Sequence, residues 1–188
     1  MKLEKLSPLR LIRVYYEHLF HDFPPAERRP LYKIFRLMAL DRYDFWVMRD
    51  GKELFAYGAV ARADGDVMLD YLAVCRGKRG QGHGSRMLAL LEQEYAGKAI
   101  FLEAEDPDVP CSGEERQIRL DRLRFYQRAG FLDSGVRCDV YGVDFVILCK
   151  GPGMNAREAQ RRLDRIYRAV FTPKAYEEHI RYTGTDEV

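Results

Sequence analysis

The sequence predicts a mixed α/β fold in which a mostly antiparallel, twisted sheet carries helices on both faces. Apolar residues first recur at helical spacing, and runs of strand formers joined by turn signals come next. An apolar strand, a glycine-rich loop, a helical pattern and a second apolar strand then follow one another. This succession predicts a right-handed crossover, which places one parallel pair of strands around the glycine loop.

Two helices are expected at the beginning of the chain. Ser7 is a suitable N-cap, and Pro8 occupies the first helical position. Apolar residues then recur at helical spacing, and this helix is expected to end near Asp22. Pro30 can start the second helix.

Three antiparallel strands are expected next. Residues 45–48 are rich in strand formers, and Asp50-Gly51 is a strong hairpin signal. Residues 54–60 form the returning strand, and residues 67–74 form the third strand after another turn. The elements expected after the glycine loop are a helix over 82–95, a strand over 99–104, a basic helix over 114–129, and strands over 131–138 and 141–150.

Residues 151–153, Gly-Pro-Gly, mark a break in the pattern. Beyond it, an amphipathic helix and a short helix starting at Thr172-Pro173 are expected. We therefore expect one domain over residues 1–150 and a helical appendage over residues 151–188. The appendage is a candidate cover for the substrate side of the domain, or a contact in a homodimer.

The composition narrows the function classes. A formal net charge of +2 over 188 residues gives no reason to expect nucleic acid as a partner. No apolar run approaches the ~20 residues of a membrane span, and the N-terminus lacks the apolar core of a signal peptide. Four scattered cysteines fit free thiols in the cytoplasm and no metal site.

The loop after residues 67–74 has the composition of an anion site. Residues 76–86 contain four glycines and four Lys or Arg residues. Glycine lets a ligand approach the backbone, and the N-terminus of the following helix favours negative charge. An ordinary turn is the alternative, but this composition at a strand–helix junction favours a site for a phosphorylated ligand.

Two motifs resemble the GNAT N-acetyltransferase superfamily. Residues 79–84, RGQGHG, match its Arg/Gln-x-x-Gly-x-Gly/Ala signature, and residues 72–74 resemble the strand end that precedes it. Residues 125–131, FYQRAGF, resemble its later motif, in which a tyrosine near a helix end precedes Gly-Phe and a strand. The resemblance covers roughly residues 7–150 and implies the GNAT acyltransferase fold.

The resemblance implies that acetyl-coenzyme A is the co-substrate. The strand end would pair with the pantetheine arm, and backbone N–H groups of the loop would hold the pyrophosphate. Tyr126 would protonate the departing thiolate. The cofactor-binding residues implied are Leu72, Ala73, Val74, Arg79, Gly80, Gln81, Gly82, His83, Gly84 and Ser85.

An amine that attacks a thioester directly needs a base but no enzyme nucleophile. Glu103, Glu105 and Asp70 are the candidate bases, and Glu103 is preferred by its position. The alternative for Glu103 is a strand carboxylate paired with an arginine. The family often has an asparagine seven residues before the tyrosine, where this chain has Arg119, so the usual contact to the pantetheine is in question.

The sequence therefore predicts a cytoplasmic N-acetyltransferase that acts on a small-molecule or peptide amine. Two alternatives stay open. A non-catalytic acyl-coenzyme A sensor would bind the thioester and transfer nothing. A dinucleotide-binding redox enzyme would explain Gly80-x-Gly82 and an acidic residue about twenty positions later, but position 85 is serine instead of the third glycine.

Overall fold

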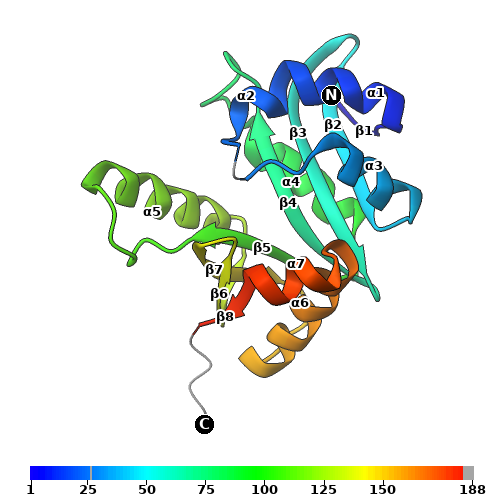
Figure 1. Cartoon of the computed structure of the whole chain (residues 1–188). Coiled ribbons are helices and arrows are strands. Elements are labelled where there is room, and N and C mark those ends of the chain that lie inside the picture. The colour runs from blue at the N-terminus through cyan, green and yellow to red at the C-terminus, as the bar shows by residue number, and fades with distance from the viewer. Residues whose placement is uncertain (26, 184–188) are drawn as a thin grey trace. The chain divides into compact units, whose positions relative to one another are not determined.

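The computed structural model describes residues 1–25 and 27–183 (Figure 1). Its contacts divide the chain into two compact units. The first comprises Met1–Arg62 and Leu69–Ala96, and the second comprises Ala63–Met68 and the chain from Gly97 onward. Within the described ranges, no helix is long and apolar enough to cross a bilayer.

The first helical segment of the first unit is the one expected after Ser7. It consists of α1 (Pro8–Val14), a π-helical turn η1 (Tyr15–Leu19) and the single turn α2 (Phe20–Asp22). The π-helical turn was not expected, because no local pattern distinguishes it from α-helix. The second expected helix is α3 (Leu31–Ala39).

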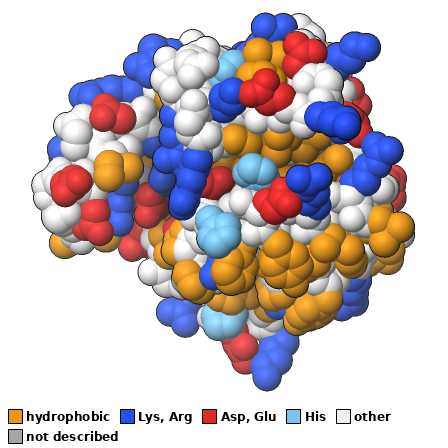
Figure 2. Space-filling model, turned by 90° about the horizontal axis from the view of Figure 1, so that it is seen from above, with side chains coloured by type: hydrophobic (Ala, Val, Ile, Leu, Met, Phe, Trp, Pro, Cys, Tyr) orange, Lys and Arg blue, Asp and Glu red, His pale blue; other side chains and the backbone are white. Residues whose placement is uncertain are grey.

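One face of the first helical segment is buried and the other is exposed. Leu11, Tyr15 and Leu19 recur every four residues and are buried. Large hydrophobic side chains also lie on the outer face, where Tyr16 and Phe20 are exposed. Figure 2, viewed from above Figure 1, shows hydrophobic side chains gathered among charged ones on the surface.

The strands of the first unit follow the order β1-β2-β3-β4. Antiparallel pairing places Lys2 opposite Arg49 and Tyr43 opposite Ala61. The first of these strands was not predicted, because four residues without an apolar alternation carry no strand signal. The bounds are β1 (Lys2–Lys5), β2 (Tyr43–Asp50), β3 (Glu53–Ala63) and β4 (Asp66–Val74), and α4 (His83–Glu94) follows the glycine loop.

The second unit contains the beginning of β4 and the strand that follows the crossover. The Val67 N–H donates to the Ala99 carbonyl oxygen at 3.0 Å, just before β5 (Ile100–Glu105). The strand order continues from β4 through β5-β7-β6-β8 with antiparallel pairs after β5. The mixed α/β prediction is thus confirmed. The other elements are α5 (Gly113–Arg128), β6 (Leu132–Val140), β7 (Val143–Lys150), α6 (Ala156–Val170), α7 (Pro173–His179) and β8 (Ile180–Tyr182).

The connection between β6 and β7 is a two-residue turn. Tyr141 and Gly142 have φ values of +55° and +82°, as a type I′ hairpin turn requires. A tyrosine in this region is strained. Its N–H donates to the His179 carbonyl oxygen at 2.9 Å, and its ring stacks on the His179 ring at a centroid distance of 4.2 Å.

The amphipathic helix expected after residue 153 is α6. The Asn155 side chain accepts from the Glu158 N–H at 2.9 Å and caps its first turn. Apolar side chains on one face of α6 are buried, and α6 packs against β6 of the same unit. Residues 184–188 of the expected appendage lie outside the described residues, and the domain boundary at residue 150 stays a prediction.

Candidate active site

The glycine-rich loop connects Val74, the last residue of β4, to His83, the first residue of α4. Gly77, Gly80 and Gly82 each have φ of +76°, which disfavours any residue with a Cβ atom. A Cβ built at any of the three meets no atom within 4 Å. Backbone conformation, and not crowding, therefore selects glycine here, and the space beside the backbone is open to a ligand.

The N-terminus of α4 has no side-chain cap. Its N-cap is Gly82 in the left-handed conformation, and its first turn contains no acidic residue. In contrast, α5 begins with a full capping box between Ser112 and Glu115. The first N–H groups of α4 lack intrahelical acceptors and lie at the positive end of the helix dipole, so they are suited to bind an anion.

The end of β4 lies next to this loop in the first unit. Leu72, Ala73 and Val74 are partly exposed, whereas residues 66–69 of the same strand are buried. The Val74 carbonyl oxygen accepts a 3.4 Å hydrogen bond from Arg79 Nε. The structure thus brings together two sets of residues that the resemblance implied, 72–74 and 79–85.

The imidazole ring of His83 is buried and packs near the Phe55 ring. The side chain is buried, with the residue 8% exposed, and lies 4.9 Å from the Phe55 ring. Its Nε2 atom is buried and has no hydrogen-bond partner within residues 1–25 and 27–183. Its backbone N–H belongs to the uncapped first turn of α4, so binding through the backbone stays a prediction.

Tyr126 lies in the second unit, near the C-terminus of α5. The residue is 9% exposed, and its ring lies 6.0 Å from the Phe131 ring. Burial raises the pKa of Tyr126 above the ordinary value for tyrosine, with Arg122 opposing the shift. The phenol is therefore protonated at neutral pH, the form that a proton donor needs.

Glu103 lies on β5 and accepts a 2.6 Å hydrogen bond from the hydroxyl of Tyr167 on α6. Tyr167 is fully buried, and burial, followed by the charge of Glu103, raises its pKa well above the ordinary value. The helix beyond residue 150 therefore supplies a direct partner of the preferred base. The sequence offered one signal for it, because Tyr167 lies within the amphipathic helix that was expected beyond residue 153.

The two other candidate bases are held in ion pairs. Asp70 accepts from Arg29 Nε at 2.8 Å and Nη2 at 3.2 Å, and also from the Tyr43 hydroxyl. Glu105 accepts from Arg122 Nη1 at 2.7 Å. Charge-assisted hydrogen bonds of this kind hold both carboxylates in place, which favours a structural role for both.

Arg119, which occupies the position of the usual asparagine, also lies in the second unit. Its Nη1 donates to the Asp106 carbonyl oxygen at 2.9 Å, and its Nη2 lies 3.9 Å from a Glu105 oxygen. These contacts attach α5 to the end of β5. The Arg119 side chain therefore has a structural role within this unit.

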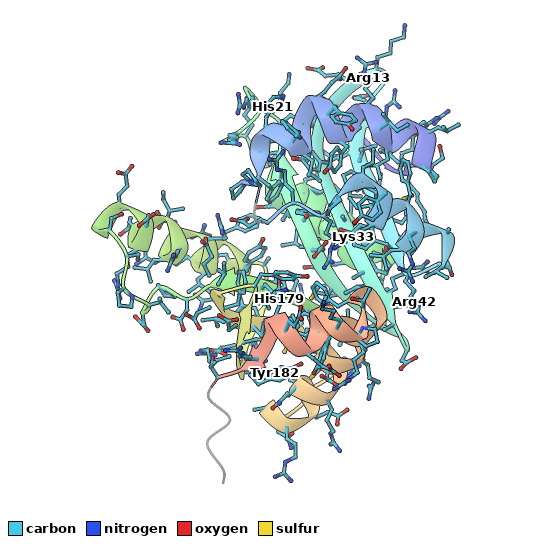
Figure 3. All side chains as sticks on the ribbon, viewed as in Figure 1. Arg13, His21, Lys33, Arg42, His179 and Tyr182 are labelled. Carbon is cyan, nitrogen blue, oxygen red and sulfur yellow. The ribbon has the colours of Figure 1, made fainter. Side chains whose placement is uncertain are left out.

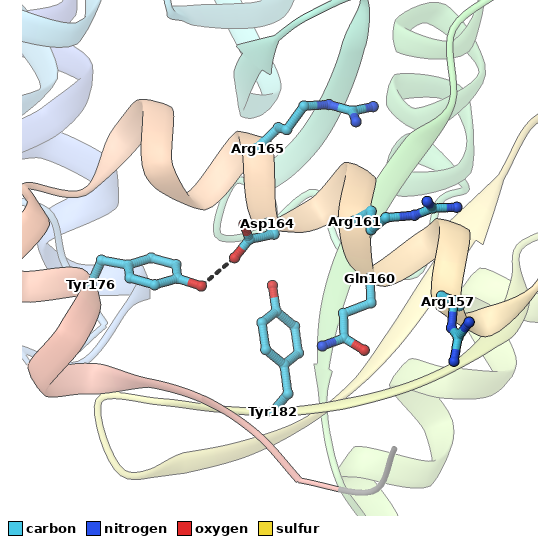
Figure 4. Close-up of a pocket in the computed structure, with 7 residues that line it drawn as sticks. All are labelled: Arg157, Gln160, Arg161, Asp164, Arg165, Tyr176 and Tyr182. Atoms are coloured by element: carbon cyan, nitrogen blue, oxygen red, sulfur yellow. Dashed lines mark hydrogen bonds between the residues drawn. The ribbon is translucent and has the colours of Figure 1, made fainter. Parts of the chain in front are cut away.

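A cavity of about 560 Å³ lies in the second unit among α6, α7 and β8 (Figure 4). Its carboxylate, Asp164, accepts from Arg168 Nε at 2.7 Å and from the Tyr176 hydroxyl. Arg161 on its rim is paired with Glu158 at 2.7 Å. No residue that the sequence analysis selected lines this cavity, so it is separate from the candidate site.

Residues 41–132 match the family model of the acetyltransferase (GNAT) domain. YjbC of Bacillus subtilis (strain 168), whose name assigns it provisionally to the acetyltransferases, is 33% identical over 117 residues. That match covers 62% of this chain and 56% of YjbC, so the chain spans little more than half the length of this curated relative.

Solved structures share the fold at low sequence identity. A GNAT-family protein from Bacteroides thetaiotaomicron has a TM-score of 0.69 at 20% identity, covering 87% of this chain and 93% of its own. An aminoglycoside 6′-N-acetyltransferase complexed with coenzyme A has a TM-score of 0.57 at 16% identity, covering 80% and 96%. This protein thus has a mixed α/β structure with the fold of the acetyltransferases. The match over residues 41–132 and the shared fold support membership of the GNAT superfamily of acetyltransferases.

Proposed function

We propose that this protein is an N-acetyltransferase that uses acetyl-coenzyme A as co-substrate. The observation that carries the proposal is the loop before α4. Three glycines at φ of +76° leave open space beside the backbone, and the helix that follows has no side-chain cap. This geometry suits a pyrophosphate, and the family of the chain supports coenzyme A as its source.

The proposed reaction needs few groups from the protein. The amine nitrogen attacks the thioester carbonyl carbon, a C–N bond forms and the C–S bond breaks. Glu103, directly or through a water molecule, takes the proton of the amine, and Tyr126 gives a proton to the thiolate. A backbone N–H of residues 72–74 polarises the carbonyl. The protonated state of Tyr126 and the carboxylate on β5 support these roles.

The acceptor is proposed to be a primary amine on a small molecule or a peptide. We also propose that residues 1–150 form the acetyltransferase domain, that residues 151–188 are its appendage, and that the protein acts in the cytoplasm. Four free cysteines support the last proposal, because disulfides are rare in a reducing compartment.

The decisive experiment combines binding and turnover. Acetyl-coenzyme A is expected to raise the melting temperature, whereas NAD is expected to leave it unchanged. Release of free thiol is then measured with a panel of amines. Stabilisation without turnover on any amine would favour an acyl-coenzyme A sensor, and no stabilisation by any coenzyme A thioester would refute the proposal.

A further inference from the structure

Asp22, the last residue of α2, is a carboxylate buried next to the glycine loop. Its side chain is only 5% exposed. One oxygen accepts from the Tyr57 hydroxyl at 2.9 Å, and the other lies 3.4 Å from Arg79 Nη2 and 3.9 Å from Arg76 Nε. A buried carboxylate is stable only when such partners surround it, so its position depends on the loop.

Arg79 connects Asp22 to the end of β4. Its Nη2 donates to Asp22, and its Nε donates to the Val74 carbonyl oxygen at 3.4 Å. One guanidinium therefore bridges three segments of the first unit: α2, the end of β4 and the loop itself. Arg79 is the first residue of the RGQGHG motif, and this bridge directs two of its donors toward the protein.

Neighbouring contacts strengthen this connection. Arg76 Nη2 donates to the carbonyl oxygen of His21 at 3.3 Å, at the end of the helical segment where Figure 3 labels His21. Burial and then the charge of Asp22 raise the pKa of Cys75 to about 11. The first contact joins the end of α2 to Arg76, and the second places Asp22 near Cys75, so the end of α2 lies against the first residues of the loop.

We propose that Asp22 and Arg79 are positioning residues that hold the loop in its binding conformation. The inference rests on the proposed function, and it assigns the Arg79 side chain to the protein while the loop backbone binds the pyrophosphate. A loop held in place before binding loses less conformational entropy when the ligand arrives. The affinity for coenzyme A therefore depends on a carboxylate 57 residues earlier in the chain.

A double-mutant cycle tests the proposal with D22N, R79Q and the double variant. The dissociation constant of coenzyme A is measured by calorimetry. Each single variant is expected to raise it about tenfold, and the double variant is expected to raise it no further, because both changes break the same bridge. Additive losses, with R79Q far more harmful than D22N, would show that Arg79 binds phosphate directly and would overturn the proposal.

Kinetics and a matched control complete the test. KM for acetyl-coenzyme A should rise in both single variants while kcat stays within twofold, and R79K should recover part of the loss. The control is R13Q, which removes an exposed arginine paired with Glu17 at 2.9 Å on the same helical segment. R13Q is expected to leave binding unchanged, and a tenfold loss in R13Q would overturn the proposal by showing a general charge effect.

Folding and the wider function are separated in the same experiment. D22N keeps the shape of the side chain and an oxygen for the Tyr57 hydroxyl, and R79Q changes a side chain that is 66% exposed. D22N is therefore expected to melt near the wild-type temperature. R79Q removes a cation beside the buried Asp22 carboxylate, so it is expected to melt at a lower temperature and to remain folded at the temperature of the titration. A wild-type protein that binds no coenzyme A species would refute the proposed function, whereas wild-type binding that D22N leaves unchanged would refute the bridge alone.

Discussion

Replacing Gly82 with alanine tests the loop that carries the proposed function. Gly82 is the N-cap of α4 at φ of +76°, and an added Cβ meets no atom within 4 Å. The left-handed conformation costs an L-residue about 1–2 kcal/mol. Alanine also reduces the conformational entropy of the unfolded chain, which raises the free energy of unfolding by about 0.4–1 kcal/mol. The net loss of unfolding free energy is therefore about 1 kcal/mol, or roughly 2–4 °C in melting temperature for a chain of this size.

Gly142 offers a matched control for the backbone effect. It has φ of +82° in the β6–β7 turn, and an added Cβ there also meets no atom within 4 Å. G142A should therefore lose a similar amount of stability in thermal unfolding without ligand. The two variants are then compared in calorimetric titrations with coenzyme A.

The two variants should differ in binding. In G82A the methyl group lies in the open space through which an anion approaches the first N–H groups of α4, so the dissociation constant should rise at least about tenfold. G142A should bind coenzyme A within about twofold of the wild type. Equal affinities of the two variants would refute the assignment of this loop as the pyrophosphate site.

Three further predictions concern the proposed acid and bases. Y126F should lower kcat about 100-fold or more at unchanged KM. Burial raises the pKa of Tyr126 above its ordinary value of 10.0. In the wild-type pH–rate profile, activity should therefore be lost through deprotonation of this donor only above pH 10. E103Q should abolish turnover, and full turnover in this variant would exclude Glu103 as the base. Y167F removes the hydroxyl that donates to Glu103, so it should mainly lower the free energy of unfolding, by about 1–3 kcal/mol measured in urea. D70N should lower the free energy of unfolding by about 3–5 kcal/mol in the same assay. The variant leaves the charge of Arg29, whose side chain is 13% exposed, without its carboxylate partner. A loss below about 1 kcal/mol would contradict a structural role for Asp70.

Local patterns in the sequence predicted the longer elements well. The helix over 82–95 corresponds to α4 (His83–Glu94), and the strand over 99–104 corresponds to β5 (Ile100–Glu105). Each depends on apolar periodicity and on glycines that end or begin an element, which are properties of neighbouring residues. β1 and β8 were missed, because three or four residues at a sheet edge become strands only through pairing with β2 and β6.

The sequence by itself determined the glycine loop, the strand end before it and the position of Tyr126, because these motifs consist of residues close together in the chain. The tertiary structure decided which charged groups act together. Asp22 lies 57 residues from Arg79, and Tyr167 lies 64 residues from Glu103. Hydrogen bonds between side chains so far apart leave no periodicity in the sequence. Only the packing of α2 against the loop and of α6 in the second unit brings these partners within reach.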